Sequence, residues 1–351
     1  MEVEEGPFRK LATVRTIDEI RPIENADAIE CAIVDGWAVV IKKGDFQAGD
    51  RAIYLEIDSW VPHELAPFLS KGKEPREYHG SKGERLRTVK LRGQISQGLL
   101  LPLQSTIESI AVPPITTEIG DDLSTALGIV KWERPAEWHG ASQGGPWPSL
   151  IPKTDQERVQ NVKRELAEWV AQGLSWEITE KLDGSSMSVY LIDGKFGVCS
   201  RNIDLYDDEV CTFWKVARKY NLEEIMRSHG DNFVIQGELI GPKIQGNKYK
   251  LNDHELRVFD IYDIPTGSYW NATDRRLFCL GKDLPQVPLS DLHQDEAHCI
   301  LALDFEQIIA IADGESFLAD TPREGLVFKC ISKPEIHFKA ISNAFLLGEK
   351  G

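Results

Sequence analysis

Residues 8–104 contain a series of short apolar, β-branched segments, and this series constrains the fold more than any other feature of the chain. Segments such as KLATVRTI, AIECAIV, WAVVIKK and RAIYLEI are separated by turn signals at Asp35-Gly36 and Gly49-Asp50. Short strands without clear helices between them predict a small β-barrel, and the OB-fold is the commonest barrel that would fit. We therefore expect an OB-like domain over residues 1–120.

The next region is dense in Pro, Gly and Trp and ends with GASQGGPWPSLIP, so we expect a linker over residues 121–152. Within it, GASQG at 140–144 matches the nucleophile elbow of hydrolases. That motif requires a strand before it and a helix after it, whereas here Trp138-His139 precedes it and Pro146-Trp147-Pro148 follows it. A hydrolase is therefore not favoured.

Residues 153–351 read as a second domain of the α+β class, built on antiparallel sheets with helices between the strands. The segment Thr154-Asp155-Gln156-Glu157 matches a capping box and predicts the start of a helix. Further helices are expected near 208–228 and 304–312. The helical spacing after the capping box is shown by Val159, Val162, Leu166, Trp169 and Val170.

Composition indicates a cytoplasmic protein without a membrane span. No run approaches the ~18 apolar residues that a membrane helix needs, and the acidic opening MEVEEGPFRK lacks the apolar core of a secretory signal. The six cysteines show no C-x-x-C pair, which fits a reducing compartment and argues against a structural zinc site. A net charge of -16 argues against a general polyanion binder, although a local basic face would still bind nucleic acid.

The stretch EKLDGSSMSVY at 180–190 permits two interpretations. Asp183-Gly184 is a strong turn signal followed by an alternating strand, so Lys181 is either an ordinary residue before a surface hairpin or a nucleophile. Further polar positions follow at strand ends, and no P-loop is present. In order, these are Cys199-Ser200-Arg201, FVIQGELIG at 233–241, LRVFDIYDI at 256–264, REGLVFK at 323–329 and His337-Phe338-Lys339.

This series resembles the motifs of the covalent nucleotidyltransferase superfamily, which contains ATP-dependent polynucleotide ligases and RNA capping enzymes. The chain ends soon after Lys339, so the OB domain that follows the last motif in DNA ligases has no room, whereas an OB-like domain comes first. With PKTDQERVQN, RTVKLRGQISQGLLLPL and FKAISNAFLL, the chain is similar to the RNA ligase clade with an N-terminal OB domain. The resemblance implies sealing of nicked duplex RNA or an RNA-DNA hybrid, with no obligate protein partner.

The resemblance also implies a role for each motif. Lys181 attacks the α-phosphorus of ATP to give lysyl-AMP. Glu180, Arg201, Glu238, Phe259 and Lys339 contact the nucleotide, with Phe259 stacked on adenine and Glu238 at the ribose. Asp183, Glu238 and Glu324 supply hard oxygen ligands for Mg²⁺ or Mn²⁺, directly or through water.

The proposed roles are chemically reasonable but carry one departure from the family pattern. A lysine attacks as the neutral amine, so its pKa of ~10.4 must fall by about 3 units through burial, nearby cations or a metal ion. The last motif usually has a Lys-x-Lys pair, and here the first lysine is His337. Lys329 or Lys333 would be the candidates to replace its phosphate contact.

A local basic segment, KGERLRTVKLR at 82–92, is a candidate nucleic-acid contact through Arg85, Arg87, Lys90 and Arg92. On one regular strand, alternate cations would point to opposite faces, and a bulge at Thr88-Val89 would bring them together. A solvated charged strand is the alternative. For the whole chain, the alternatives to an RNA ligase are a DNA ligase and a nick-binding protein whose transferase domain no longer reacts.

Overall fold

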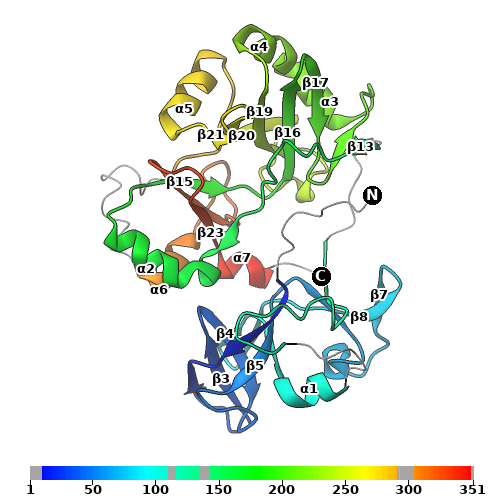
Figure 1. Ribbon diagram of the computed structural model, residues 1–351, viewed down its shortest axis with the longest axis vertical. Helices are drawn as coiled ribbons and strands as arrows, with labels where there is room; N and C mark the ends of the chain where they lie inside the picture. The colour runs from blue at the N-terminus through cyan, green and yellow to red at the C-terminus, as the bar shows by residue number, and fades with distance from the viewer. Residues whose placement is uncertain (1–9, 110–115, 134–142, 291, 293–303, 349–351) are drawn as a thin grey trace. The chain divides into compact units, whose positions relative to one another are not determined.

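The computed structural model describes residues 10–109, 116–133, 143–290, 292 and 304–348. The chain forms two compact units, Met1–Ala136 and Glu137–Gly351, which are described separately. The ribbon is coloured from the N-terminus to the C-terminus (Figure 1). Sheets that are antiparallel except for the parallel pair β14-β23, together with short helices, make up the two units, in agreement with the α+β prediction.

The first unit is β-rich. Among the described residues its strands belong to separate small sheets, ordered β1-β5-β11, β2-β3-β4, β12-β6-β8-β7 and β9-β10, and not to one closed barrel. Alternate apolar residues such as Val14, Ile53, Leu55 and Leu101 form its core. Its elements are β1 Ala12–Thr16, β2 Glu19–Pro22, β3 Ile29–Val34, β4 Trp37–Lys42, β5 Arg51–Leu55, β6 Ser59–Pro62, η1 Pro67–Ser70, β7 Arg76–Tyr78, β8 Ser81–Arg85, β9 Val89–Leu91, β10 Gln94–Ser96, β11 Leu99–Pro102, α1 Leu103–Ser109 and β12 Val130–Lys131.

The second unit contains two sheets. The larger has seven strands in the order β13-β18-β17-β16-β19-β20-β21, and the smaller has four in the order β14-β23-β22-β15. Its strands are β13 Gln143–Pro146, β14 Glu157–Arg158, β15 Trp176–Lys181, β16 Ser185–Ile192, β17 Lys195–Cys199, β18 Ile203–Leu205, β19 Phe233–Ile240, β20 Glu255–Asp263, β21 Ser268–Tyr269, β22 Gly325–Cys330 and β23 His337–Ile341. Its helices are η2 Val159–Val162, α2 Lys163–Ala171, α3 Thr212–Lys219, α4 Leu222–His229, η3 Gln245–Asn247, α5 Ala272–Gly281, α6 Phe305–Ala312 and α7 Asn343–Gly348.

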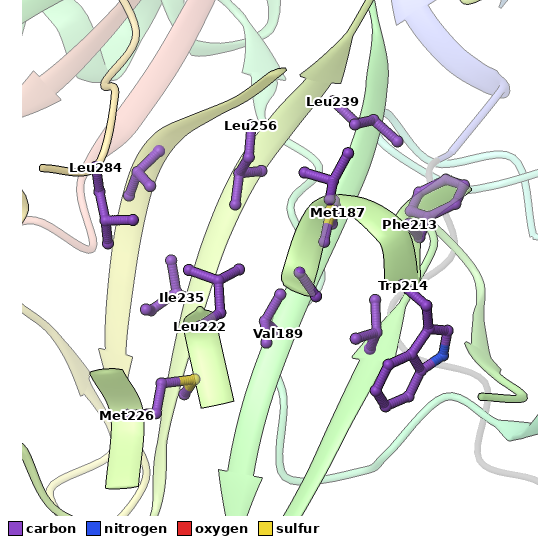
Figure 2. Close-up of a cluster of buried hydrophobic side chains, with 14 of the residues drawn as sticks. Met187, Val189, Phe213, Trp214, Leu222, Met226, Ile235, Leu239, Leu256 and Leu284 are labelled. Carbon is purple, nitrogen blue, oxygen red and sulfur yellow. The ribbon is translucent and has the colours of Figure 1, made fainter. Parts of the chain in front are cut away.

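Each sheet of the second unit packs its apolar face against helices. Helices α3, α4 and α5 cover the larger sheet, and Figure 2 shows Leu222 and Met226 of α4 facing Val189 and Ile235 of the strands. Helices α2 and α6 cover the smaller sheet, where Trp176, Phe328 and Phe338 form the aromatic centre of the core. The opposite face of the smaller sheet carries polar side chains, whereas that of the larger sheet also has a small apolar cluster with Ile151, Tyr190 and Val234.

The predicted helices near 153–170 and 208–228 are each altered in the structure. The capping box at Thr154 does not start a helix: β14 and η2 come first, and α2 begins at Lys163 without a side-chain cap. The helix expected over 208–228 is two helices, because Asn221 adopts a left-handed conformation (φ 51°) between α3 and α4. The third prediction is confirmed, since Asp304 and Gln307 form a capping box at the start of α6.

None of the described helices is long and apolar enough to cross a bilayer. The five cysteines within the described ranges are buried and free, namely Cys31, Cys199, Cys211, Cys279 and Cys330. The GASQG segment lies partly outside the described residues; Gln143 and Gly144 belong to β13.

Candidate active site

The turn after Lys181 connects the two sheets of the second unit. Lys181 ends β15 in the four-stranded sheet, and Ser185 begins β16 in the seven-stranded sheet, with Leu182, Asp183 and Gly184 between them. The hairpin interpretation of this stretch is therefore wrong, because β15 and β16 do not pair. The turn places Lys181 and Asp183 where the two sheets meet.

Strand register gathers the later motifs on the same polar face as Lys181. In β22, Lys329 pairs with Glu177 of β15 on one side and with His337 of β23 on the other. Because side chains alternate along a strand, Lys181, Lys329, His337 and Lys339 share one face, opposite the aromatic core. Motifs that are far apart in sequence thus meet through register alone.

Lys181 forms an ion pair with Glu324, with 2.8 Å between Nζ and Oε1. Burial lowers the pKa of Lys181, but the carboxylates of Glu324, Glu238 and Asp183 outweigh burial and raise its pKa above the ordinary value. The pKa of Lys181 thus shifts upward, opposite to the downward shift expected for a nucleophile. Neutralisation of these carboxylates is what would release the free amine.

Glu238 lies beside the same turn. Its Oε1 accepts a hydrogen bond from the backbone N–H of Gly184 at 3.0 Å. Burial raises the pKa of Glu238 to about 8, and the charges of Glu324 and Asp183 add to this effect. Burial and the neighbouring Asp183 also raise the pKa of Glu324.

These crowded carboxylates are the donor set that a hard divalent cation prefers, and such an ion would relieve their mutual repulsion. Within the described ranges, however, no group of three or more His, Cys, Asp or Glu side chains is arranged to hold one metal ion directly. Asp183, Glu238 and Glu324 therefore fit a cation held partly through its waters, as Mg²⁺ and Mn²⁺ commonly are.

Phe259 is the extra residue of a β-bulge. Along β19 the pairing passes from Gln236 to Gly237, while along β20 it passes from Asp260 to Val258. Bulges re-aim side chains next to active sites. Phe259 is half-buried against the cluster of Leu182, Ile240, Tyr249 and Val287 that surrounds the turn after Lys181.

Glu180 is buried and points to the side of the sheet opposite Lys181. Its Oε2 accepts a hydrogen bond from the backbone N–H of Phe317 at 2.8 Å, and burial raises the pKa of its carboxyl. The structure therefore gives the Glu180 side chain a bracing contact with residues 316–317.

Arg201 and Lys339 are placed less tightly. Arg201 lies in the turn after β17, half-exposed, with its guanidinium 2.7 Å from Asp155. Lys339 lies on the polar face of β23. Its positive charge is close enough to Glu324 to offset part of the rise that burial causes in the pKa of Glu324. Both side chains are on this unit and accessible to a ligand.

Lys329 does not take over the phosphate contact of the missing lysine. Its ammonium group is buried and bonded to the Asp260 carboxylate. His337, the residue in the lysine position, is also mostly buried, and burial together with Lys329 lowers its pKa, so it is neutral at pH 7. Lys333 lies in the exposed turn between β22 and β23.

Residues that sequence reasoning did not identify also build the site. Gln245, Lys248 and Tyr249 contact the turn after Lys181 from a loop after β19. Arg323, next to Glu324, donates to the carbonyl oxygens of Ile311, Ala312 and Asp313 and so fixes Glu324 to the end of α6. From the sequence, only Lys248 and Arg323, as charged residues in or near the motifs, could have indicated these roles.

The basic segment of the first unit is neither one strand nor a bulged strand. Strand β8 ends at Arg85, and a separate hairpin begins at Val89, with Arg92-Gly93 as its turn. Arg85 is bonded to Asp58 at 2.6 Å and stacked 4.0 Å from the Trp132 ring centre, so it serves the fold. Lys90 and Arg92 are exposed on the hairpin, and Arg87 is half-buried.

Comparison with known proteins agrees with this architecture. An OB-fold domain family matches residues 11–103, and the RNA ligase family matches residues 174–341. No curated protein matches the chain. Among solved structures, a Naegleria gruberi RNA ligase mutant with ATP and Mn is 42% identical, with a TM-score of 0.88, and the match covers 97% of this chain and 99% of that one.

Other structures of that ligase match equally well. A mutant with AMP and Mn is 43% identical, with a TM-score of 0.88 over 97% of this chain and 99% of that one. The ligase with PPi is 43% identical, with a TM-score of 0.87 over 97% and 98%. An OB-fold unit joined to a nucleotidyltransferase unit with a lysine among carboxylates defines a covalent ligase architecture. This chain belongs to the RNA ligase family.

Proposed function

We propose that the protein is an ATP-dependent ligase that seals 3′-OH and 5′-phosphate ends at nicks in duplex RNA or an RNA-DNA hybrid. The observation that carries this proposal is Lys181 at the meeting point of two sheets, in ion-pair contact with Glu324 and beside Glu238 and Asp183. The relatives whose structures contain ATP, AMP or PPi support the nucleotide. The buried free cysteines are compatible with work in the cytoplasm.

In the first step, the Lys181 amine attacks the α-phosphorus of ATP. The Lys181 ammonium first loses one proton to solvent; then a P–N bond forms, the bond from the α-phosphorus to the bridging oxygen breaks, pyrophosphate leaves, and the attacking nitrogen loses a second proton to solvent. Lys339, on the same sheet face, stabilises charge on the departing phosphates. Phe259 and the half-exposed Arg201 hold the adenosine, and Glu238 takes the ribose or the cation.

Mg²⁺ or Mn²⁺ near Asp183, Glu238 and Glu324 would offset phosphate charge and favour the neutral amine. The carboxylates that raise the pKa of Lys181 are the same ones whose charge a cation would neutralise, so cation binding would lower the pKa of Lys181. The Gly184 N–H keeps Glu238 aimed at the turn. Relatives with bound Mn support this choice of cation.

In the later steps, AMP passes from Lys181 to an oxygen of the 5′-phosphate, and the P–N bond breaks. The 3′-OH then attacks the phosphorus of the 5′-phosphate, and AMP leaves. We assign duplex contact to the first unit, through Lys90 and Arg92 on the exposed β9-β10 hairpin and through Arg87 beside it. Contacts to phosphates and 2′-OH groups are typical of duplex RNA recognition.

A nick-binding protein without chemistry is the second candidate, and the neutral His337 in the lysine position is the observation in its favour. One experiment separates the two. Purified protein, first treated with pyrophosphate to remove any attached AMP, is incubated with α-labelled ATP and Mg²⁺ or Mn²⁺ beside Lys181→Ala. Label retained by wild type and lost in the variant supports the ligase; no label on folded wild type supports the nick-binding protein.

A further inference from the structure

The loop from Gly241 to Lys250 has an unusual backbone. The non-glycine residues Lys243, Gln245, Asn247 and Lys250 all adopt positive φ angles, of 65°, 46°, 50° and 53°. Such conformations are strained for residues other than glycine and persist only where surrounding contacts impose them. The loop is therefore held in this shape by its contacts.

Those contacts converge on the turn after Lys181. The Gln245 side-chain amide donates to the Gly184 carbonyl at 3.2 Å, and the Asp183 backbone N–H donates to the Tyr249 hydroxyl at 2.7 Å. Between them, the Lys248 ammonium is ion-paired with the Asp183 carboxylate. The turn is thus bonded to the loop at its backbone and at its side chain.

Lys248 is also fixed on its other side. Its Nζ lies 4.0 Å from the ring centre of Phe345 in α7, which is a cation–π geometry. The side chain is 35% exposed, so its removal would not open the core. The remaining lysines of the loop, Lys243 and Lys250, are exposed, and among the described residues neither has an ion pair.

We propose that Lys248 is a positioning residue of the adenylylation site, which orients the Asp183 carboxylate and competes with the divalent cation for it; this rests on the function proposed above. When Asp183, Glu238 and Glu324 are all ionised they carry a formal charge of -3, and the ammonium groups of Lys181 and Lys248 bring the total to -1. Without Lys248 the charge becomes -2. The cation then binds more tightly, while the unheld carboxylate slows the reaction.

The test compares Lys248→Met with Lys248→Arg and with Lys250→Met, which removes the same charge from the same loop without touching the turn. Mn²⁺ binding is measured without ATP, from the electron paramagnetic resonance signal of free Mn²⁺. Transfer of label from α-labelled ATP is measured at saturating Mn²⁺. Thermal unfolding checks each variant's fold.

We expect Lys248→Met to bind Mn²⁺ several-fold more tightly, to accept label about tenfold more slowly and to unfold within 2 °C of wild type. Lys248→Arg should recover most of both properties, and Lys250→Met should match wild type. Unchanged or weaker Mn²⁺ binding in Lys248→Met would overturn the proposal. If wild type accepts no label, the proposed function fails, but the Mn²⁺ comparison still decides whether Lys248 competes with the cation.

Discussion

The Nζ atom of Lys181, at the end of β15, and the Oε1 atom of Glu324, the residue before the paired strand β22, lie 2.8 Å apart in an ion pair. Glu238, which also raises the pKa of Lys181, belongs to the other sheet. The lysine is therefore held as an ammonium ion from both sides until a cation takes over the carboxylates. The predictions below test separate parts of this arrangement.

Replacing Glu324 with Gln should slow adenylylation of Lys181 at least ~100-fold, because the neutral amide lacks the negative charge that attracts a divalent cation. Stability should stay the same or rise, since a buried and crowded carboxyl is removed. The measurement is the initial rate of label transfer beside a thermal unfolding curve. A rate near that of wild type would show that Glu324 has no part in the reaction.

The metal-free protein should lose stability as pH rises through the range set by Glu238. Its pKa is about 8 in the folded protein and ordinarily 4.5, so the folded state binds more protons than the unfolded state between these values. Its contribution is fully present below pH 4.5 and is lost as pH rises through 8; Glu324 acts in the same direction.

Urea unfolding from pH 5 to 9 would measure this slope in wild type and Glu238→Gln. The variant should show a flatter dependence, and Mn²⁺ should stabilise wild type most at pH 8 and above. Equal slopes in the two proteins would mean that Glu238 ionises normally.

Replacing Gly184 with Ala should displace the turn. An added Cβ would lie 2.4 Å from the Leu239 carbonyl oxygen and 2.8 Å from Cγ of Glu238, so backbone and carboxylate must move. We expect ~1–3 kcal/mol of destabilisation and a larger loss of adenylylation than of stability. Gly194→Ala is the control. An added Cβ at Gly194 would have no atom within 4 Å, so any loss of stability there would come from its positive φ angle alone. Unchanged adenylylation in Gly184→Ala would contradict the close approach.

The buried pair of Lys329 and Asp260 should behave as a structural unit and not as a phosphate contact. Removing one partner leaves an uncompensated buried charge, so Lys329→Met and Asp260→Leu should each cost about 3–5 kcal/mol. The double variant should recover much of that loss in a double-mutant cycle. Additive losses would show that the two groups are independent of each other.

The β9-β10 hairpin should contribute to duplex binding but not to chemistry on Lys181. Lys90→Ala with Arg92→Ala should weaken binding of a nicked duplex and reduce the slope of log affinity against log salt by about 2. Lys71→Ala with Lys73→Ala, which removes two exposed cations elsewhere in the first unit, is the control. If both double variants lose affinity equally, general charge explains the binding.

Much of this site could be predicted from sequence, because each motif is short and lies in or next to a strand with a clear apolar pattern. The resemblance carried by short motifs singled out Lys181, Glu238 and Glu324, and the structure brings their charges close together where the two sheets meet. The buried ion pair of Lys329 could not be predicted from the nearby sequence, because its partner Asp260 belongs to a different sheet. The ion pair of Lys248 with Asp183 could not be predicted either, because it joins a loop after β19 to the turn after Lys181.

Other features depended on backbone geometry. The Asp183-Gly184 signal correctly marks a change of direction, but the same signal serves a hairpin and a crossing between sheets. The bulge at Phe259 leaves no trace in the apolar run of its strand. The ion pair of Arg85 with Asp58, which removes one cation from the basic segment, cannot be predicted from a charge count.

The crossing at residues 182–184 divides the reacting groups between two bodies of structure. Lys181 and Glu324 are attached to the four-stranded sheet, and Glu238 belongs to the seven-stranded sheet. Any widening of the space between the sheets would separate Glu238 from the lysine while leaving the Lys181–Glu324 pair intact. A change in the distance between the two sheets would thus be enough to bring the reacting groups together or to separate them, while each sheet keeps its own structure.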